Sequence, residues 1–272
     1  MTRPVALVTG ASAGIGRELA RLLAADHDLI LTARREAELH ALAAELPAKC
    51  LVLPEDLSDP AGPKRLLNAI AESGWPLDTF VNNAGFGDVG SFADADAAKL
   101  AAMIQVNVTA FTELLRGVLP GMKARGRGRI LNVGSVAGFQ PGPYMATYYA
   151  TKAYVNSLSE AIASELAGSG ITVTCLCPGP VETEFAAAAG FEKGGFSAGA
   201  KLTARDVAAA GIRALNRGRV RVIPGWRNRL MIALQRFVPR FVVTRAVKLM
   251  LRQRLHSPHT GVYPVESETR DS

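Results

Sequence analysis

Tyr148 and Lys152 have the residue types and the spacing for acid–base chemistry. They stand four positions apart in a segment that predicts a helix, so both side chains should lie on one face, one turn apart. A phenol is a weak acid with a pKa of about 10 in model peptides, and a nearby ammonium favours its ionised form. The pair is therefore suited to give a proton to a developing alkoxide, as carbonyl reduction requires. Tyr149 lacks this arrangement because residue 153 is alanine.

A glycine-rich turn near the start of the chain could hold a phosphate. An apolar, strand-like run ends at Thr9, and Gly10, Gly14 and Gly16 follow before an amphipathic helical pattern. Glycines permit a tight turn and let backbone N–H groups approach a phosphate, while the helix N-terminus supplies partial positive charge. The turn therefore predicts a dinucleotide site, and a purely structural turn is the alternative.

These residues need a scaffold, and the chain alternates strand-like and helical patterns. The strand-like runs are apolar on both faces, which is typical of a parallel sheet covered by helices on each side. They occupy residues 4–10, 28–33, 50–57, 78–85, 129–135, 171–177 and 219–224. We therefore predict an α/β fold with a doubly wound parallel sheet of the Rossmann type.

The composition indicates one domain followed by a basic tail. Residues 1–225 contain neither a linker nor a repeat and form the predicted catalytic domain. Residues 226–272 form an appended tail with helical periodicity, which Pro239 should split in two. No acid occurs between Asp206 and Glu266, whereas twelve basic residues lie between positions 213 and 254. The formal net charge of +7 is thus concentrated in one segment.

Helical phasing over residues 241–254 separates a basic side from an apolar side. The basic side holds Arg245, Lys248 and Arg252, and the opposite side holds Val243, Val247 and Met250. Three interpretations remain open: a solvated helix packed on its own domain, a membrane-surface anchor, or a dock for an anionic carrier. Nucleic-acid binding is the least supported, because no aromatic platform accompanies the charge.

Cysteine and histidine usage excludes two kinds of site. Cys50, Cys175 and Cys177 are an odd number in a long chain, so no disulfide framework is expected, and the latter two should be inert core thiols. The four histidines and the cysteines have no metal-ligand spacing, so we predict no metal. His27 and His40 fall at surface-like helix positions and are assigned no role.

The hydropathy pattern predicts a cytoplasmic protein. The first residues enter a strand at once, without an apolar export signal. No stretch approaches the roughly 20 uninterrupted apolar residues that a spanning helix needs. The most apolar late region, residues 229–251, is broken by arginines and a lysine.

The spacing T-G-x-x-x-G-x-G at residues 9–16 resembles that of the short-chain dehydrogenase/reductase family. Further stretches match the family in the expected order: Asp56-Leu57, Asn82-Asn83-Ala84-Gly85, Ser135, Tyr148 with Lys152, and Pro178-Gly179-Pro180-Val181-Glu182-Thr183. The resemblance covers roughly residues 4–224, and it implies an oxidoreductase that transfers a hydride between a nicotinamide and a carbonyl or alcohol carbon.

The resemblance implies a role for each catalytic residue. Tyr148 is the acid/base, Lys152 lowers its pKa and binds ribose, and Ser135 donates a hydrogen bond to the substrate oxygen. The thirteen residues from Ser135 to Tyr148 are the usual family separation. Asn107 matches the asparagine that holds a water beside the lysine, although it could instead only bond a neighbouring carbonyl. Gly134 departs from the family, where many relatives have serine, and should affect loop shape more than chemistry.

The end of the second strand-like run favours NADP over NAD. A carboxylate there would bind a free ribose 2′-OH, but Arg34 and Arg35 stand in its place and can clamp a 2′-phosphate. Against this, Ala13 stands where some NADP-preferring relatives carry a basic residue. A solvated helix start is the other interpretation of the two arginines. By resemblance, the cofactor should contact Gly10, Ser12, Gly14, Ile15, Gly16, Arg34, Arg35, Asp56, Leu57, Asn83, Ala84, Gly85, Tyr148, Lys152, Pro178, Gly179, Val181 and Thr183.

The substrate is expected to be a hydrophobic ketone, aldehyde or alcohol. Residues 184–200 fall where the family has its substrate-covering segment, and Phe185, Phe191 and Phe196 suggest an apolar lid, although an ordinary loop is an equal alternative. A 3-oxoacyl thioester reductase, an NADP(H) sensor without turnover and a peripheral membrane protein are the other hypotheses. By analogy with the family, the chain should form a homo-oligomer.

Overall fold

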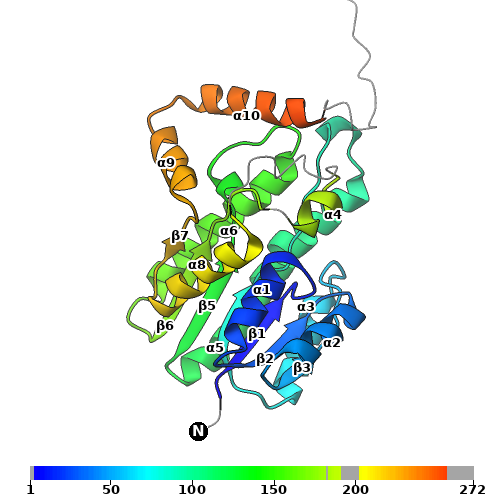
Figure 1. Ribbon diagram of the computed structural model, residues 1–272, viewed down its shortest axis with the longest axis vertical. Helices are drawn as coiled ribbons and strands as arrows, with labels where there is room; N and C mark the ends of the chain where they lie inside the picture. Colours follow the sequence, from blue (N-terminus) through cyan, green and yellow to red (C-terminus); the bar gives the residue numbers. More distant parts are fainter. Residues whose placement is uncertain (1–2, 182, 191–201, 256–272) are drawn as a thin grey trace, which may run out of the picture.

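The computed structural model describes residues 3–181, 183–190 and 202–255, and a seven-stranded parallel sheet forms its centre (Figure 1). The strands are β1 (Val5–Thr9), β2 (Asp28–Thr32), β3 (Cys50–Val52), β4 (Leu77–Asn82), β5 (Gly128–Val133), β6 (Ile171–Leu176) and β7 (Arg221–Val222). Their order is β3-β2-β1-β4-β5-β6-β7, so the chain reverses direction across the sheet between β1 and β4. This is the predicted doubly wound sheet, and such a reversal is where this fold class binds ligands.

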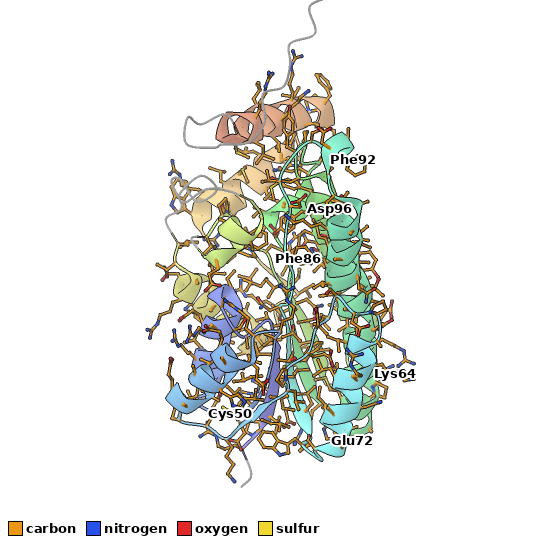
Figure 2. The ribbon with its side chains drawn as sticks, turned by 90° about the vertical axis from the view of Figure 1, so that its right-hand side faces the viewer. Cys50, Lys64, Glu72, Phe86, Phe92 and Asp96 are labelled. Carbon is orange, nitrogen blue, oxygen red and sulfur yellow. The ribbon has the colours of Figure 1, made fainter. Side chains whose placement is uncertain are left out.

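Helices cover both faces of the sheet. They are α1 (Gly14–Leu23), α2 (Glu36–Glu45), α3 (Gly62–Glu72), α4 (Ala97–Ile104), α5 (Phe111–Ala124), α6 (Ala146–Glu165), α7 (Glu184–Ala188), α8 (Ala204–Asn216), α9 (Trp226–Gln235) and α10 (Arg240–Leu255). Shorter elements are the 3-10 helices Phe92–Asp94 and Val136–Phe139 and a π-helical turn, Gln105–Ala110. Figure 2 shows α3, which carries Lys64 and Glu72, on the opposite side of the sheet from α1 and α2.

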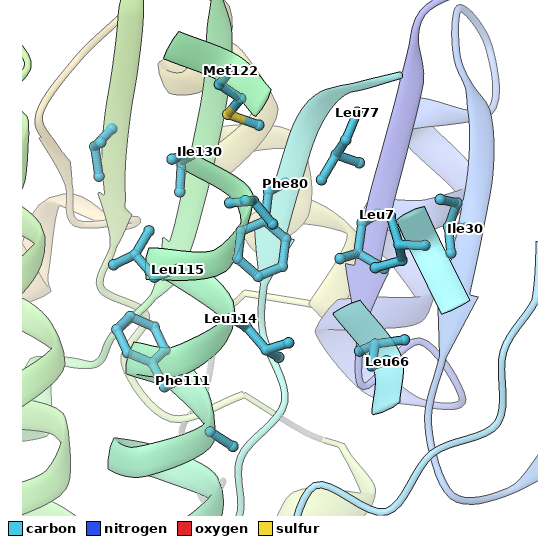
Figure 3. Packing of buried hydrophobic residues seen from close by; sticks show 14 of the residues in the cluster. Leu7, Ile30, Leu66, Leu77, Phe80, Phe111, Leu114, Leu115, Met122 and Ile130 are labelled. Atoms are coloured by element: carbon cyan, nitrogen blue, oxygen red, sulfur yellow. The ribbon is translucent and has the colours of Figure 1, made fainter. Parts of the chain in front are cut away.

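Alternation along the buried strands builds two cores, one on each face. In β1, Val5 and Leu7 belong to the core under α3, α5 and α6, whereas Ala6 and Val8 belong to the core under α1, α2 and α8. Successive strand residues point to opposite faces, so a central strand is apolar throughout. Figure 3 shows Leu7 among the side chains of the first core. The two cores hold the loops at the carboxyl ends of the strands in place.

His27 differs from its expected position on a helix surface. It follows α1, is buried, and lies between Asp26, Thr79 and Arg129. Its Nδ1 is 2.5 Å from an Asp26 carboxylate oxygen, and its Nε2 is 3.1 Å from the Thr79 hydroxyl. Helix α1 ends at Leu23, so His27 lies in the turn before β2 and points into the amino-terminal edge of the sheet. The prediction for His27 was therefore wrong, whereas His40 is exposed as expected.

The segment after residue 225 forms two helices that meet near Pro239, as the sequence predicts. On α10, Val247 and Leu251 are buried against Met103 of α4 and Met145 before α6. Met250, expected on the same apolar side, is 39% exposed. Figure 1 shows α10 across one end of the molecule. None of the helices in the described residues combines the length and hydrophobicity that a membrane span needs.

Candidate active site

A cleft of about 1390 Å³ runs along the carboxyl ends of the strands. Its walls come from the loops after β1, β2, β3, β4, β5 and β6 and from helices α6, α7, α9 and α10. Every residue predicted to contact a cofactor lines this cleft, and so do Ser135, Tyr148 and Lys152. Asn107 lies directly behind the wall, since a Cβ on Gly85 would lie 3.0 Å from its Oδ1.

The glycine loop at one end of the cleft has the geometry of a phosphate cradle. Gly10 and Gly14 adopt φ values of 65° and 54°, which favour glycine. A Cβ on Gly16 would lie 2.3 Å from the Gly10 carbonyl oxygen, so only glycine lets the first turn of α1 pack on the loop. Asn83 secures the loop from β4, because its Nδ2 donates to the Thr9 carbonyl at 2.9 Å. The loop thus presents the amino end of α1 to the cleft.

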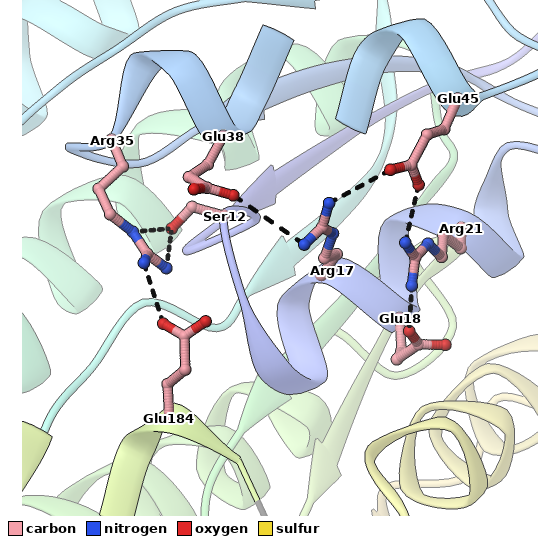
Figure 4. Close-up of polar contacts among 8 residues, drawn as sticks. All are labelled: Ser12, Arg17, Glu18, Arg21, Arg35, Glu38, Glu45 and Glu184. Atoms are coloured by element: carbon pink, nitrogen blue, oxygen red, sulfur yellow. Dashed lines mark hydrogen bonds and ion pairs between the residues drawn. The ribbon is translucent and has the colours of Figure 1, made fainter. Parts of the chain in front are cut away.

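Basic side chains flank this cradle. Arg34 and Arg35 are exposed at the rim, and the Arg35 guanidinium donates to Ser12 Oγ at 3.3 Å and forms an ion pair with Glu184 of α7 at 2.9 Å (Figure 4). Arg35 thereby joins the glycine loop to α7. An anion in the cradle would compete with Glu184 for this guanidinium.

Asp56, after β3, borders the same end. Burial acts to raise the pKa of Asp56, but hydrogen bonds from the Ser58 hydroxyl and N–H hold the pKa below its usual value. The carboxylate therefore stays ionised and fixed.

Ser135, Tyr148 and Lys152 meet at the other end of the cleft, and all three are buried. Ser135 ends the loop after β5, where its Oγ accepts from the Ala137 N–H at 3.0 Å. Tyr148 and Lys152 lie one turn apart on α6, with Lys152 Nζ 5.9 Å from the centre of the Tyr148 ring. The ammonium donates to the Val133 carbonyl at 2.8 Å. The structure thus brings together the three residues that the spacing singled out.

Burial dominates the acid–base properties of this group. It raises the pKa of Tyr148 well above the usual value for a phenol, and a hydrogen bond with Ser135 offsets part of the rise. It also lowers the pKa of Lys152 to about 8. The sequence led us to expect that Lys152 lowers the pKa of Tyr148, but here desolvation has the larger effect. Tyr148 therefore carries its proton at neutral pH in this structure, and a lowering of its pKa by Lys152 stays a prediction.

Asn107 lies in the π-helical turn between α4 and α5. Its Nδ2 donates to the Phe86 carbonyl at 2.9 Å and to Thr151 Oγ1 at 3.1 Å, and its Oδ1 accepts from the Phe86 N–H. The side chain of Asn107 thus forms its hydrogen bonds with the loop after β4 and with α6. This matches the neighbouring-carbonyl alternative, and the water-holding role stays a prediction.

Asn156 is a buried neighbour of Ser135 that the sequence analysis did not select. Its Nδ2 donates to the Ser135 carbonyl at 3.0 Å, and its Oδ1 accepts from the Ser135 N–H at 3.4 Å. A Cβ on Gly134 would lie 2.0 Å from this Oδ1, which explains the glycine there. The sequence did contain a signal for Asn156. It follows Tyr148 and Lys152 at i, i+4, i+8 spacing, which places the three residues on one face of α6. The Cys175 and Cys177 thiols point at the same oxygen.

Phe185 of α7 packs on Tyr148, with ring centres 5.3 Å apart. The expected lid therefore contacts the chemical end of the cleft through this residue. Phe191 and Phe196 lie outside the described residues.

Helices α9 and α10 form a wall of the cleft that the sequence analysis did not anticipate. Trp226, Leu230 and Leu234 of α9 line it, and so do Val243 and Val247 of α10. The wall is attached to the 3-10 helix that follows Ser135, because Gln235 Nε2 donates to the Phe139 carbonyl at 3.0 Å. The tail thus contributes an apolar surface to the site. Among the described residues no cluster of three or more potential metal ligands occurs.

Comparisons with known proteins agree with this geometry. The family described as short chain dehydrogenase matches residues 4–193. An uncharacterized oxidoreductase of Staphylococcus epidermidis is 32% identical over 212 residues, which cover 78% of this chain and 90% of that protein. A short-chain dehydrogenase from Sphingobium yanoikuyae in complex with NADPH has a TM-score of 0.77 and 32% identity, over 97% of this chain and 99% of that one. A 3-ketoacyl-(acyl-carrier-protein) reductase from Brucella melitensis complexed with NADH has a TM-score of 0.73 and 27% identity, over 82% and 97%.

Proposed function

This chain belongs to the short-chain dehydrogenase/reductase family, and on that premise we propose that it reduces a hydrophobic ketone or aldehyde, or oxidises the corresponding alcohol, with NADP(H). It is an oxidoreductase of the family and uses a nicotinamide cofactor. One observation carries the proposal. The buried group of Ser135, Tyr148 and Lys152 shares a continuous cleft with the glycine loop.

Four residues of the chain have separate roles in the proposed reaction. A bound nicotinamide supplies or accepts the hydride. Tyr148 donates the proton of its hydroxyl to the carbonyl oxygen in the reducing direction. The Ser135 hydroxyl donates a hydrogen bond to the same oxygen, which stabilises the developing negative charge. Lys152 would hold the ribose hydroxyls, and Asn107 would keep a water beside it.

The glycine loop and the rim arginines fit NADP(H). The loop would hold the pyrophosphate, and Arg34 with Arg35 would bind the 2′-phosphate, since these arginines stand where an NAD-binding carboxylate would end β2. The dehydrogenase from Sphingobium yanoikuyae was solved with NADPH, whereas the reductase from Brucella melitensis was solved with NADH. The preference of this chain therefore depends on its own arginines.

Replacing both Arg34 and Arg35 with alanine should weaken NADPH binding about 100-fold and leave NADH binding nearly unchanged, because hydrogen bonds between charged groups contribute about 1.5–3 kcal/mol. The measurement is the dissociation constant of each cofactor by fluorescence titration. Glu184→Gln should instead tighten NADPH binding, since it releases Arg35. Arg217→Ala, an exposed change after α8, is the control. An unchanged NADPH-to-NADH ratio in the double variant would show that the preference for NADP is wrong.

The cleft supports a hydrophobic substrate. Phe185 covers the Tyr148 ring, and the wall from α9 and α10 is mainly aliphatic. The test is NADPH consumption with a panel of ketones that share the carbonyl and differ in chain length. We expect kcat/KM to rise with apolar length, and equal rates across the panel would contradict it.

A 3-oxoacyl thioester reductase is the second candidate, favoured by the similarity to the reductase from Brucella melitensis and by the basic helices, which suit a phosphate-bearing carrier. Activity on 3-oxoacyl thioesters is compared with activity on free ketones, for the full chain and for a variant with Arg240 and Arg245 reversed to glutamate. A preference for thioesters that depends on these arginines would favour this candidate.

We also propose that the enzyme works in the cytoplasm as a homo-oligomer. Tyr154 on α6 is 37% exposed beside Thr112 of α5, whose hydroxyl it meets at 2.9 Å, so these helices offer a contact surface. Light scattering with Tyr154→Glu tests this assignment.

A further inference from the structure

The corner between α9 and α10 exposes aromatic side chains. Phe237 and Phe241 stand on either side of Pro239 and are 85% and 74% exposed. Large apolar side chains that cluster on a surface indicate a binding site for a membrane, a protein or an apolar ligand. Figure 1 shows this corner at the end of the molecule that α10 crosses, and in Figure 2 the orange ribbon of both helices again lies at one end.

The same surface is strongly basic. Arg229, Arg236, Arg240, Arg245 and Lys248 are exposed, and none forms an ion pair with an acid of the described residues. The sequence contains no acid from residue 207 to 265. Phe241, Arg245 and Lys248 follow the i, i+4, i+7 spacing of one helix face. The surface therefore offers positive charge around apolar tips.

The cleft has an apolar mouth at this corner, where Val238 and Val242 line it and are 39% and 42% exposed. Trp226 lines the cleft and is nonetheless 65% exposed, and Leu230 and Leu234, which continue its stripe along α9, are also exposed. A hydrophobic ligand could thus pass from outside to Tyr148 along apolar side chains.

We infer that the corner of α9 and α10 docks on an anionic lipid bilayer, and that the cleft receives its hydrophobic substrate from the bilayer; the second part rests on the proposed function. Phe237 and Phe241 enter the boundary between headgroups and acyl chains, while the basic residues face lipid phosphates. A second copy of the chain would bring like charges together across the contact. An acidic carrier protein would match the charge but would leave the exposed phenylalanines unexplained.

The binding test is co-sedimentation of the full chain with phosphatidylcholine vesicles that contain or lack phosphatidylglycerol. We expect binding only to the anionic vesicles. The pairs Phe237→Ser with Phe241→Ser and Arg240→Glu with Arg245→Glu should each weaken it at least about tenfold. Arg217→Glu with Arg219→Glu makes the same charge change on either side of Gly218, which lies beside Thr172 near the amino end of β6, and should bind like the native protein. Thermal melting confirms that each variant folds.

Kinetic measurements test whether the cleft receives its substrate from the bilayer. Reduction of a long-chain ketone dissolved in anionic vesicles should fall with vesicle binding in the corner variants, while reduction of a short water-soluble ketone should stay unchanged. If the native protein stays in the supernatant, or if the Arg217 and Arg219 control loses binding equally, the docking inference is wrong. If the protein sediments but reduces no ketone, the proposed function fails and the docking stands.

A second, independent inference concerns Asn156, the buried neighbour of Ser135. Its amide holds both the N–H and the carbonyl of Ser135, and it stands on α6 one turn after Lys152. We propose that Asn156 is a positioning residue, which sets the Ser135 hydroxyl relative to Tyr148. Since it does not line the cleft, it should act on kcat through Ser135 and leave cofactor binding alone.

Asn156→Ala should lower kcat about 10- to 100-fold, since small displacements of a catalytic group are costly, with the NADPH dissociation constant unchanged. Gly134→Ser alone should destabilise the protein, because its Cβ would meet Asn156 Oδ1. In the Asn156→Ala background this clash is absent, so Gly134→Ser should destabilise the protein less than it does alone. An unchanged kcat in Asn156→Ala, or an equal loss of cofactor affinity, would refute the positioning role.

Discussion

Tyr148→Phe should lower kcat about 1000-fold, the range that general acid catalysis contributes, while the dissociation constant for NADPH stays close to the native value. The variant removes only the hydroxyl. Its ring still packs against Phe185 and Tyr149, at 5.3 and 6.2 Å between ring centres. Because burial raises the pKa of Tyr148, its hydroxyl keeps its proton at neutral pH, and the variant lacks this donor.

The measurement is NADPH oxidation at saturating ketone, with cofactor titrations on the same samples. Tyr154→Phe is the matched control, since it removes a hydroxyl from an exposed tyrosine of the same helix and should leave kcat unchanged. Retention of native kcat by Tyr148→Phe would overturn the mechanism. If the native protein and the variant bind NADPH but are equally inactive, the chain is a cofactor sensor.

Lys152→Met should abolish most activity and at the same time stabilise the unliganded protein by about 2 kcal/mol at pH 7. Burial lowers the pKa of Lys152 from 10.5 to about 8, and each pKa unit corresponds to about 1.4 kcal/mol, or about 3 kcal/mol in all. The lost hydrogen bond to the Val133 carbonyl offsets about 1 kcal/mol of this gain. A residue that the proposed chemistry needs thus lowers the stability of the fold.

Because burial lowers the pKa of Lys152, the stability of the native protein depends on pH. Below pH 8 the lysine is charged in both states, so the folded protein bears the whole cost of desolvating it. Between pH 8 and 10.5 the folded state releases the proton while the unfolded state keeps it, and the native protein gains stability as the pH rises. The advantage of Lys152→Met should therefore be full below pH 8 and be lost before pH 10.5, where only the cost of the missing hydrogen bond to Val133 remains.

Urea unfolding of the native protein and the variant over this pH range measures the difference. Lys64→Met, an exposed change on α3, should show no such pH dependence. A variant less stable than the native protein at pH 7 would contradict the burial argument.

The fold could be predicted because its signals are local. Strand β1 is apolar throughout because its successive residues enter two different cores, as Val5, Ala6, Leu7 and Val8 do. Four consecutive residues are enough to predict such a strand. The glycine turn and the Tyr148–Lys152 pair are equally local, since turn geometry and the helical repeat place those groups without reference to the rest of the chain.

The remaining features join residues that are distant in the sequence. Arg35 meets Glu184 across 149 positions, Asn156 reaches Ser135 across 21, and α9 closes one wall of the cleft. His27 is buried although its neighbours suggested a surface helix. Composition and spacing describe a side chain and its near neighbours, whereas burial, desolvation and pKa depend on which other segments pack against it. For this chain, local sequence therefore specified the chemical groups and the sheet, and the packing of distant segments set their protonation, their partners and the mouth of the cleft.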